Sequence, residues 1–332
     1  MTRIVNEIET APDVSPAATL RPTRPTFGDF VDLVRPAHWI KNVVVFAGPA
    51  ASLRLADPAF ALRAILAFVC FCLAASSVYA INDVMDRDGD ARHPTKRTRP
   101  VARGAIAPAT AVVLGLCLAA MAVLMSWALH RGVTVVLLSY LALTFAYSSG
   151  VRKRVILDVI VIATGFVLRA WAGSLSVDVP ASEWLIACVF TLCLFMGFGK
   201  RRCEVAMIAN VGEARQHRGT LLRYTPDLLN HLITVSAGIA IITFLLYTLD
   251  KGGHPTPFRK DHLFYTLPIV VYGVFRFAML TETGRFTGPT EIVLKDRALL
   301  ITLFVWTLCA LLVAYQTQLF GPGGIEALYA GS

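Results

Sequence analysis

The feature that most constrains this chain is a series of long apolar segments that recur from residue 37 to residue 320. Each segment carries few or no charges and is close to the roughly 20 residues that an α-helix needs to cross a hydrocarbon layer about 30 Å thick. Hydrophobic residues make up 56% of the 332 residues, and charged residues only 16%. A soluble domain of this length does not need so much apolar sequence. We therefore predict an all-α, polytopic membrane protein with one domain.

Nine segments qualify as transmembrane helices and together form a predicted bundle over residues 35–320. The predicted spans are 37–53, 59–81, 105–129, 132–150, 155–177, 184–199, 228–249, 262–281 and 298–320. Residues 1–34 contain several prolines and mixed charges, so we expect a flexible cytoplasmic tail there. Residues 321–332 form a short C-terminal tail.

Basic residues decide how these spans are oriented. Of the 31 Lys and Arg residues, 22 lie in the N-terminal tail and in the loops after the even-numbered spans, and 5 lie on the other side. By the positive-inside rule, we predict a cytoplasmic N-terminus, a C-terminus outside and residence in the bilayer of the plasma (inner) membrane. Topology and anion binding account for the net charge of +9, so we predict no nucleic-acid partner.

An acidic segment directly follows the second predicted span. Asp83, Asp86 and Asp90, with Asn82 one turn before Asp86, fall on one helical face. Three like charges on one face repel unless a cation lies among them, and hard oxygen ligands suit magnesium better than zinc. A solvated charged loop at the membrane surface is the alternative interpretation. We predict a Mg²⁺ site formed by Asn82, Asp83, Asp86 and Asp90.

A basic segment comes directly after the acids. Lys96, Arg97 and Arg99 lie between Pro94 and Pro100. An acidic cluster beside a basic one is the composition expected around a magnesium diphosphate, where Lys or Arg neutralises the oxygens that the metal does not reach. Positive charge that only sets the topology would account for these cations, but not for the acids beside them.

A second charged cluster follows the sixth predicted span. Lys200 and Glu204 are one turn apart, with Arg201 between them, at the start of the predicted loop 200–225. Taken alone, this cluster also fits a basic helix end whose side chains reach toward water. The other long loop, 82–104, has the same position four spans earlier, so we expect both loops to cover one cavity.

Charged residues inside the spans point to the same cavity. Lys41, Arg169 and Arg276 are costly in lipid, and such residues normally face a polar interior. Tyr147, near the end of the fourth predicted span, completes the candidates for substrate binding.

The pattern N-D-x-x-D-x-x-x-D at residues 82–90 resembles the first signature of the UbiA superfamily of membrane prenyltransferases. The resemblance implies a nine-helix bundle with cytoplasmic cap loops over a central cavity, and a prenyl diphosphate bound through magnesium. Members of the superfamily usually carry a second motif, D-x-x-x-D, after the sixth helix. This chain has Lys200-Arg201-Arg202-Cys203-Glu204 in its place.

That departure resembles one branch of the superfamily, the decaprenyl-phosphate phosphoribosyltransferases of bacteria that make arabinan cell-wall polymers. The resemblance covers residues 33 to about 315. Its segments are Arg35-Pro36-x-x-Trp39-x-Lys41-Asn42, His93-Pro94-Thr95-Lys96-Arg97-x-Arg99-Pro100, Gly199-Lys200-Arg201 with Glu204, Leu168-Arg169-Ala170 with Ala172-Gly173, and Glu291-Ile292 through Lys295-Asp296-Arg297.

The resemblance implies transfer of a 5-phosphoribosyl group from phosphoribosyl pyrophosphate to polyprenyl (decaprenyl) phosphate, with release of pyrophosphate, in the synthesis of an arabinan precursor. The predicted catalytic residues are Asp83, Asp86 and Asp90. The predicted substrate-binding residues are Lys41, Asn82, Lys96, Arg97, Arg99, Tyr147, Arg169, Lys200, Arg201 and Glu204.

Two other functions remain open on the sequence. A UbiA-type enzyme with an aromatic acceptor would be expected to carry the second aspartate motif. A transporter of a lipid-linked anion would gain nothing from three carboxylates. The sequence leaves the oligomeric state open, a homo-oligomer included.

Overall fold

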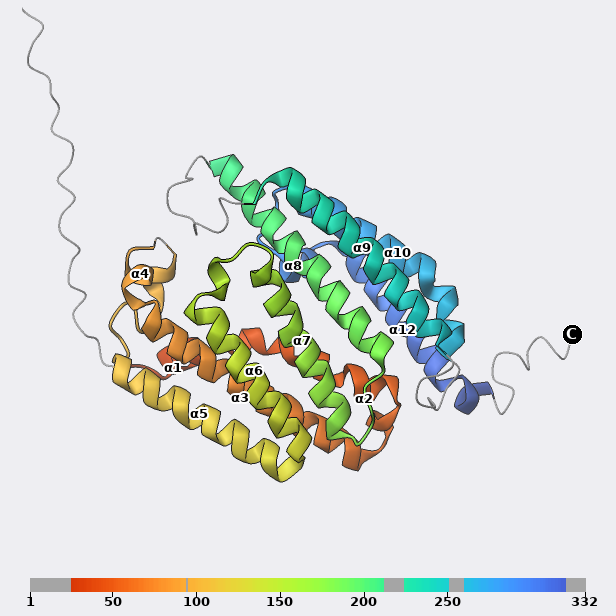
Figure 1. The fold of residues 1–332 in the computed structure, drawn as a ribbon, viewed down its shortest axis with the longest axis horizontal. Helices are drawn as coiled ribbons and strands as arrows, with labels where there is room; N and C mark the ends of the chain where they lie inside the picture. The colour runs from red at the N-terminus through yellow and green to blue at the C-terminus, as the bar shows by residue number, and fades with distance from the viewer. Residues whose placement is uncertain (1–24, 94, 212–223, 251–259, 321–332) are drawn as a thin grey trace, which may run out of the picture.

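The computed structural model describes residues 25–93, 95–211, 224–250 and 260–320. Within these ranges every regular element is a helix, and eight helices are long and apolar enough to cross a membrane. Figure 1 shows the long helices packed side by side, with short helices such as α4 at the ends of the bundle. The prediction of an all-α, multi-pass membrane protein is confirmed. The predicted tail 321–332 and most of the predicted tail 1–34 lie outside the described residues.

The long helices follow the predicted spans closely. They are α3 (Pro58–Met85), α5 (Pro108–Leu129), α6 (Arg131–Ser149), α7 (Leu157–Ser176), α8 (Glu183–Val211), α9 (Pro226–Leu249), α10 (Leu267–Glu282) with the preceding 3-10 helix η7 (Lys260–Thr266), and α12 (Arg297–Phe320). The clearest difference concerns α8, which we expected to end at residue 199. Lys200 and Glu204 therefore lie on a helix rather than in a loop, because the charged cluster keeps helical backbone bonding after the apolar sequence ends.

Proline and a polar cap set where several helices begin. Pro58 is the first residue of α3, and the Asp57 carboxylate accepts a hydrogen bond from the backbone of Ala59, 2.8 Å. Pro226 begins α9 in the same way, with Thr225 as the cap. Proline suits this position because the first helical N–H has no partner within the helix.

The first predicted span, 37–53, is not a regular α-helix. It consists of the 3-10 helix η1 (Pro36–Phe46), the short α-helix α2 (Ala47–Ala51) and, after it, the 3-10 turn η2 (Arg54–Ala56). Eleven residues of 3-10 helix and five of α-helix cover roughly 30 Å, which is enough to cross a bilayer. This segment accounts for the difference between the nine predicted spans and the eight regular ones.

Small residues allow η1 and α2 to lie directly against α7. A Cβ atom on Gly173 would be 1.7 Å from the carbonyl oxygen of Val45, and one on Gly48 would be 1.9 Å from Oγ of Ser174. Within a membrane, helices associate largely through such close backbone packing. The two glycines therefore allow the short distance between the first segment and α7.

The core consists of two main clusters that share α7. Phe71 of α3 belongs to a cluster with α5, α6 and η1, to which α7 contributes Ala172. Phe195 of α8 belongs to a second cluster with α9, α10 and α12, to which α7 contributes Val159. The molecule is thus divided into two groups of helices, and α7 contacts both.

The predicted N-terminal tail ends in a helix, α1 (Phe27–Val34), which packs on the bundle. Leu33 of this helix is fully buried, and the buried Asp29 forms an ion pair with Arg103 of the first charged loop. The folded part of the chain therefore begins at about residue 27 rather than at residue 35 as predicted. A helix of eight residues is too short to be recognised with certainty from the periodicity of its sequence.

We expect Gly173→Ala to destabilise the protein, because the added methyl group would overlap the backbone of Val45. Over-packing of this kind costs about 1–3 kcal/mol, or more where the neighbour is rigid. The melting temperature of the detergent-purified protein should fall. Gly238→Ala in α9 is the control, because no atom lies within 4 Å of its added Cβ. Equal melting temperatures for the two variants would contradict the close approach of η1 to α7.

Candidate active site

The acidic motif lies where α3 ends and α4 (Arg87–Ala91) begins. Asn82 and Asp83 are in the last turn of α3, Asp86 is at the junction and Asp90 is in α4. A backbone hydrogen bond of 2.8 Å from Asp90 to the carbonyl of Asp86 keeps helical spacing across the junction. Asp83 and Asp90 are 1% and 4% exposed, while Asp86 is partly exposed. The acids lie at the end of a membrane-spanning helix, as the apolar segment before them predicted.

Two arginines neutralise the buried pair of carboxylates. Nη1 of Arg99 lies 2.5 Å from Oδ2 of Asp90 and 3.3 Å from Oδ1 of Asp83, so one nitrogen bridges both acids. Arg35 also donates a hydrogen bond to Oδ1 of Asp83, and its guanidinium lies 5.0 Å from the ring of Tyr79. Arg35 has a φ of 55°, in the left-handed region, where the chain turns from α1 into η1. Non-glycine residues adopt this conformation rarely, and often at functional sites.

Arg152 contacts the motif directly, although we did not predict it as a site residue. It lies in the 3-10 turn η4 (Val151–Lys153) and donates one hydrogen bond to each carboxylate oxygen of Asp86, both 2.7 Å long. Two-point contacts of this kind are among the stronger ion pairs in proteins. The hydrogen bond to Asp86 raises the pKa of Arg152 above its ordinary value. The sequence signal was a run of three cations, 152–154, which we used only to assign the orientation.

The carboxylates fit a divalent cation that takes further ligands from a substrate. Oδ2 of Asp83 is buried and has no hydrogen-bond partner in the described part of the chain, an arrangement that is costly for a carboxylate oxygen. The bridging position of Arg99 shows that a positive charge fits between Asp83 and Asp90. Within the described ranges, no group of three or more His, Cys, Asp or Glu side chains is arranged to hold a metal. Phosphate or water oxygens would therefore have to complete the six ligands that magnesium requires.

Arg169 of α7 joins three elements from a buried position. Its Nε donates to Oδ1 of Asn42 on η1 at 2.7 Å, and its Nη2 donates to the hydroxyl of Tyr140 on α6 at 2.9 Å. Nη1 donates to the carbonyl of Gly165 at 2.8 Å. Each of the three guanidinium nitrogens therefore donates a hydrogen bond. No carboxylate among the described residues pairs with Arg169, so its charge is not compensated.

Lys41 adds to this positive region. It lies on η1, and its charge repels those of Lys200, Arg169 and Arg35, which come from three other segments. Lys41 forms no ion pair with a described carboxylate. Cations that lie close together repel one another, which disfavours their charged forms. A bound anion relieves this repulsion, so such a region attracts anions. The structure therefore brings Lys41, Arg169 and Lys200 into one positive region beside the acidic motif.

The second charged cluster is a buried network on α7 and α8. Nη2 of Arg201 lies 2.8 Å from Oδ2 of Asp158, and Nη1 donates to Oε2 of Glu204 at 2.6 Å. The hydroxyl of Tyr224 donates to the other oxygen of Asp158 at 2.8 Å. Lys200 is half-exposed, with Nζ 3.8 Å from Glu204. Two carboxylates thus hold Arg201 in place. No pattern in the sequence indicated Asp158 or Tyr224 as part of this cluster.

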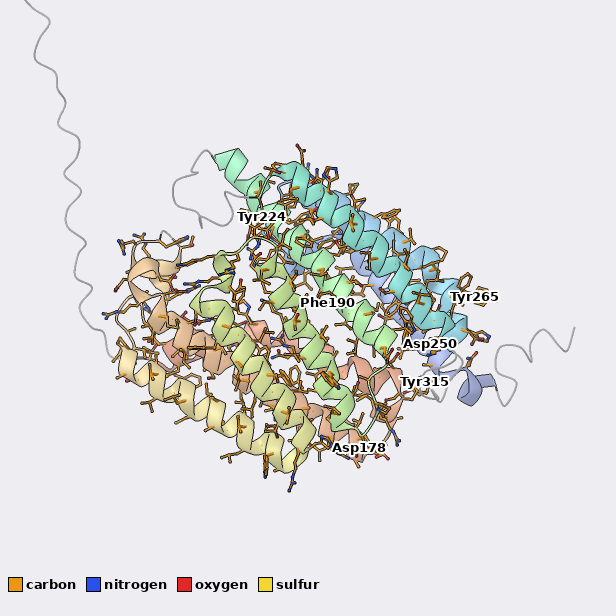
Figure 2. The ribbon with its side chains drawn as sticks, in the orientation of Figure 1. Asp178, Phe190, Tyr224, Asp250, Tyr265 and Tyr315 are labelled. Carbon is orange, nitrogen blue, oxygen red and sulfur yellow. The ribbon has the colours of Figure 1, made fainter. Side chains whose placement is uncertain are left out.

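Tyr224 also supports the connection between α6 and α7. Its hydroxyl accepts a hydrogen bond of 2.6 Å from the backbone N–H of Ile156, whose φ of 68° is unusual for a β-branched residue. In Figure 2, Tyr224 marks the end of the bundle that carries the charged clusters, and Asp178 and Asp250 lie at the opposite end. The strained connection therefore holds Arg152 and Asp158 at the charged end.

The remaining candidates lie around these clusters. Lys96 and Arg97 are in the 3-10 turn η3 (Lys96–Thr98), where Arg97 is exposed. Tyr147, near the end of α6, is close enough to both Arg152 and Arg201 to interact electrostatically with them. Tyr147 is thus near an arginine of each of the two charged clusters.

Arg276 differs from our expectation that it would face a polar cavity. Its Nη2 lies 2.8 Å from Oδ2 of Asp296, just before α12 and after the short helix α11 (Pro289–Lys295). The hydrogen bond from Arg276 lowers the pKa of Asp296. A carboxylate supplied by a neighbouring segment compensates this cation, and it takes no part in the positive region around Lys41.

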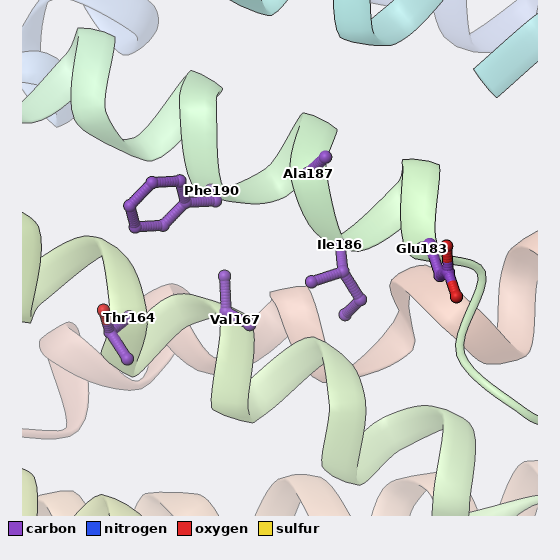
Figure 3. A pocket seen from close by; sticks show the side chains of 6 residues that line it. All are labelled: Thr164, Val167, Glu183, Ile186, Ala187 and Phe190. Atoms are coloured by element: carbon purple, nitrogen blue, oxygen red, sulfur yellow. The ribbon is translucent and has the colours of Figure 1, made fainter. Parts of the chain in front are cut away.

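A pocket of about 300 Å³ lies between α7 and α8 (Figure 3). The residues that line it are Thr164, Val167, Glu183, Ile186, Ala187 and Phe190. Apart from Glu183 at the start of α8, these side chains suit a hydrocarbon chain better than a phosphate. None of the predicted site residues lines this pocket, so it is separate from the charged clusters.

We expect Asp158→Asn to lower thermal stability, because it leaves the buried Arg201 with only one carboxylate. Breaking a buried ion pair by removing one partner costs about 3–5 kcal/mol. The control is Glu291→Gln, which removes an exposed pair with Lys295, and exposed pairs contribute at most about 1 kcal/mol. If both variants melted at the wild-type temperature, the network would have no structural role.

The fold and the site together define a class of protein: a multi-pass helical membrane protein that gathers carboxylates and uncompensated cations at one end of the bundle. The chain belongs to the UbiA prenyltransferase family, which it matches over residues 43–282. The resemblance based on residues 82–90 is thereby confirmed.

The relatives cover almost the whole chain. It is 33% identical over 299 residues to the decaprenyl-phosphate phosphoribosyltransferase of Mycolicibacterium smegmatis, covering 87% of this chain and 93% of that one. It is 31% identical over 296 residues to the protein of the same name from Corynebacterium glutamicum, covering 87% and 88%. Among solved structures, a UbiA homolog from Archaeoglobus fulgidus bound to GPP and Mg²⁺ has the same fold, with a TM-score of 0.63 and 17% identity, covering 85% of this chain and 97% of that one.

Proposed function

We propose that this protein transfers the 5-phosphoribosyl group from phosphoribosyl pyrophosphate to polyprenyl phosphate and releases pyrophosphate. The observation that carries this proposal is the similarity to decaprenyl-phosphate phosphoribosyltransferases over 87% of the chain. Their name indicates decaprenyl phosphate as the acceptor. Use of the product as an arabinan precursor is part of the proposal and is implied by the resemblance of the motifs alone. The chain also has Lys200, Arg201 and Glu204 where the family usually has a second aspartate motif.

The donor diphosphate is assigned to the acidic motif. Asp83, Asp86 and Asp90, with Asn82 beside them, would hold Mg²⁺, and the unpartnered oxygen of Asp83 supports this assignment. When bound, the magnesium ion neutralises diphosphate oxygens and so makes the diphosphate a better leaving group. The same carboxylates orient the diphosphate at the end of α3.

The basic segment that follows is assigned to the leaving group. Arg99 already lies at the carboxylates, so a diphosphate bound there comes within its reach. Lys96 and Arg97, on the adjacent turn, would bind the oxygens that face away from the acids. Donors fixed near the place where charge develops stabilise the transition state more than they stabilise the bound substrate.

The positive region is assigned to the remaining two phosphate groups, the 5-phosphate of the donor and the phosphate of the acceptor. Lys41 and Arg169 have no carboxylate partner among the described residues. They are therefore the best supported candidates for binding these two phosphate groups. Lys200 lies at the rim of the same region. The charge of Arg201 is already compensated by Asp158 and Glu204, so among these cations it is the least available to a phosphate.

The transfer itself needs no strong base. As the bond between ribose C1 and the diphosphate oxygen breaks, its electron pair leaves with pyrophosphate. An oxygen of the polyprenyl phosphate, already an anion, forms the new bond to C1 from the opposite face. The anomeric configuration is therefore inverted, and the protein's role is to place and neutralise the diphosphate, the 5-phosphate and the acceptor phosphate.

The location of the charged end follows from the distribution of basic residues. We propose that it faces the cytoplasm, where phosphoribosyl pyrophosphate is soluble, and that the protein resides in the plasma membrane. The polyprenyl chain would leave the site sideways between helices. The apolar pocket between α7 and α8 offers a surface for part of that chain.

We expect Asp90→Asn to lower turnover by about a hundredfold or more, because it removes a charge that holds the diphosphate. The assay supplies purified protein with labelled phosphoribosyl pyrophosphate, polyprenyl phosphate and magnesium. Asp88→Asn is the matched control. Asp88 lies on the same short helix and is exposed, and it forms no ion pair with Arg35, Arg99 or Arg152. Full turnover by Asp90→Asn would contradict the assigned site.

The products separate this function from the two alternatives. The proposed enzyme releases pyrophosphate only when both substrates and magnesium are present, and the mass of the lipid rises by one phosphoribosyl group. An aromatic prenyltransferase would instead consume a prenyl diphosphate, and a transporter would release no pyrophosphate. Either of these results would overturn the proposed reaction.

A further inference from the structure

The 3-10 helix η1 sorts its side chains into three faces. In a 3-10 helix, side chains three positions apart lie directly above one another, and η1 keeps this geometry over eleven residues. One face packs on α3, where Nε1 of Trp39 donates to Oγ of Ser76 at 3.0 Å. On the same face, the amide of Asn42 donates to Sγ of Cys72 at 3.2 Å. A second face includes Ile40, which is 61% exposed. Because later residues of η1 meet earlier residues of α3, the two elements run antiparallel.

The third face carries a row of polar side chains that leads from the acidic motif into the bundle. Arg35, His38 and Lys41 are each three residues apart. Arg35, which directly precedes η1, donates to Asp83. With a rise of about 2.0 Å per residue, His38 lies roughly 6 Å and Lys41 roughly 12 Å further from the charged end than Arg35. His38 therefore lies between the motif and the positive region around Lys41.

The ring of His38 is held on one side and free to bind a ligand on the other. Its centroid lies 5.4 Å from that of Tyr79, at an angle of 48°. Tyr79 is one turn before Asp83 on α3, and the guanidinium of Arg35 lies 5.0 Å from the same tyrosine ring. His38 is exposed, and neither of its ring nitrogens forms a hydrogen bond with a described residue. Both nitrogens are thus available to a ligand that lies one turn below the motif.

The proposed reaction requires a sugar at this level. Under that function, the leaving diphosphate lies at the acidic motif and the acceptor phosphate comes from the bilayer. Attack from the opposite face of C1 places the leaving group and the acceptor phosphate on opposite sides of the ribose. Arg35 lies at the motif and Lys41 lies on the bilayer side, so the ribose falls beside His38, the residue between them on the same row.

We propose that His38 binds the ribose of the donor, and that Tyr79 is a positioning residue that holds the imidazole ring. The proposal rests on the proposed function, from which it takes the donor and the acceptor. A neutral imidazole ring donates one hydrogen bond and accepts another, which suits the hydroxyl groups of a ribose. Free pyrophosphate has no sugar, so His38 contributes to the binding of the donor and not to that of the leaving group.

His38→Phe should separate the two ligands. The variant keeps an aromatic ring against Tyr79 but has no nitrogen for a hydrogen bond. Labelled phosphoribosyl pyrophosphate should bind about tenfold more weakly than to wild type, the effect expected from the loss of a hydrogen bond. Labelled inorganic pyrophosphate should bind as tightly as to wild type. Both affinities are measured by equilibrium dialysis on the full-length protein in detergent, at saturating Mg²⁺ and without acceptor.

His231→Phe is the matched control. His231 is an exposed histidine of α9, and its Nδ1 donates to the backbone carbonyl of Asp227 at 2.8 Å. The same substitution there should change neither affinity. His38→Gln keeps one donor and one acceptor, so it should bind phosphoribosyl pyrophosphate more tightly than His38→Phe does. If His38→Phe does not fold, His38→Ala takes its place, with the same expected loss for phosphoribosyl pyrophosphate alone.

Unchanged binding of phosphoribosyl pyrophosphate to His38→Phe would overturn the ribose subsite. An equal loss of affinity for both ligands would also overturn it, because His38 would then only support the acidic motif. A loss for His38→Gln as large as that for His38→Phe would contradict the hydrogen-bonding role. Turnover is a separate measurement. If the wild-type protein makes no phosphoribosylated lipid, the proposed function fails, whereas a selective loss of phosphoribosyl pyrophosphate binding in His38→Phe still supports the subsite.

Discussion

The ion pairs between one acidic motif and arginines from three segments hold the charged end of this bundle together. Carboxylates at the end of a membrane-spanning helix repel one another, and burial strengthens that repulsion. Asp83 and Asp90 are stable in their buried positions because Arg99 bridges them. Arg152, in the link between α6 and α7, neutralises the partly exposed Asp86 through a two-point contact. The ion pairs of the motif therefore help to position these segments, in addition to the apolar core.

At this end of the bundle, some charged side chains are compensated by a partner of opposite charge and others are not. This difference determines which ligands the site can bind. The acidic motif is balanced by arginines, and Arg201 is balanced by two carboxylates. Lys41 and Arg169 have no such compensation among the described residues, although Arg169 satisfies its hydrogen bonds through Asn42 and Tyr140. A region with fixed donors and excess positive charge suits a ligand with several phosphate groups. The acids beside it suit the metal that accompanies a diphosphate.

Several features could be predicted from the sequence because their causes are local. The apolar segments predicted the helices, and the end of the second apolar segment predicted that Asp83, Asp86 and Asp90 follow a membrane-spanning helix directly. The predicted end of α8 was wrong, because charged residues continue a helix as readily as apolar ones when they can pair one turn apart. Arg276 was also misjudged, since its partner Asp296 lies on another segment and no local pattern connects the two.

By itself, the sequence determined that the protein spans a membrane repeatedly, that it belongs with UbiA-type proteins and that residues 82–90 form its acidic motif. Hydropathy and helical period carry this information, and both can be read over about twenty neighbouring residues. Only the tertiary structure decided which cation meets which acid. Arg152 lies 66 residues from Asp86, and Arg169 lies 127 residues from Asn42. Such pairs form because the glycine contacts of η1 with α7 and the shared core of α7 bring these segments together.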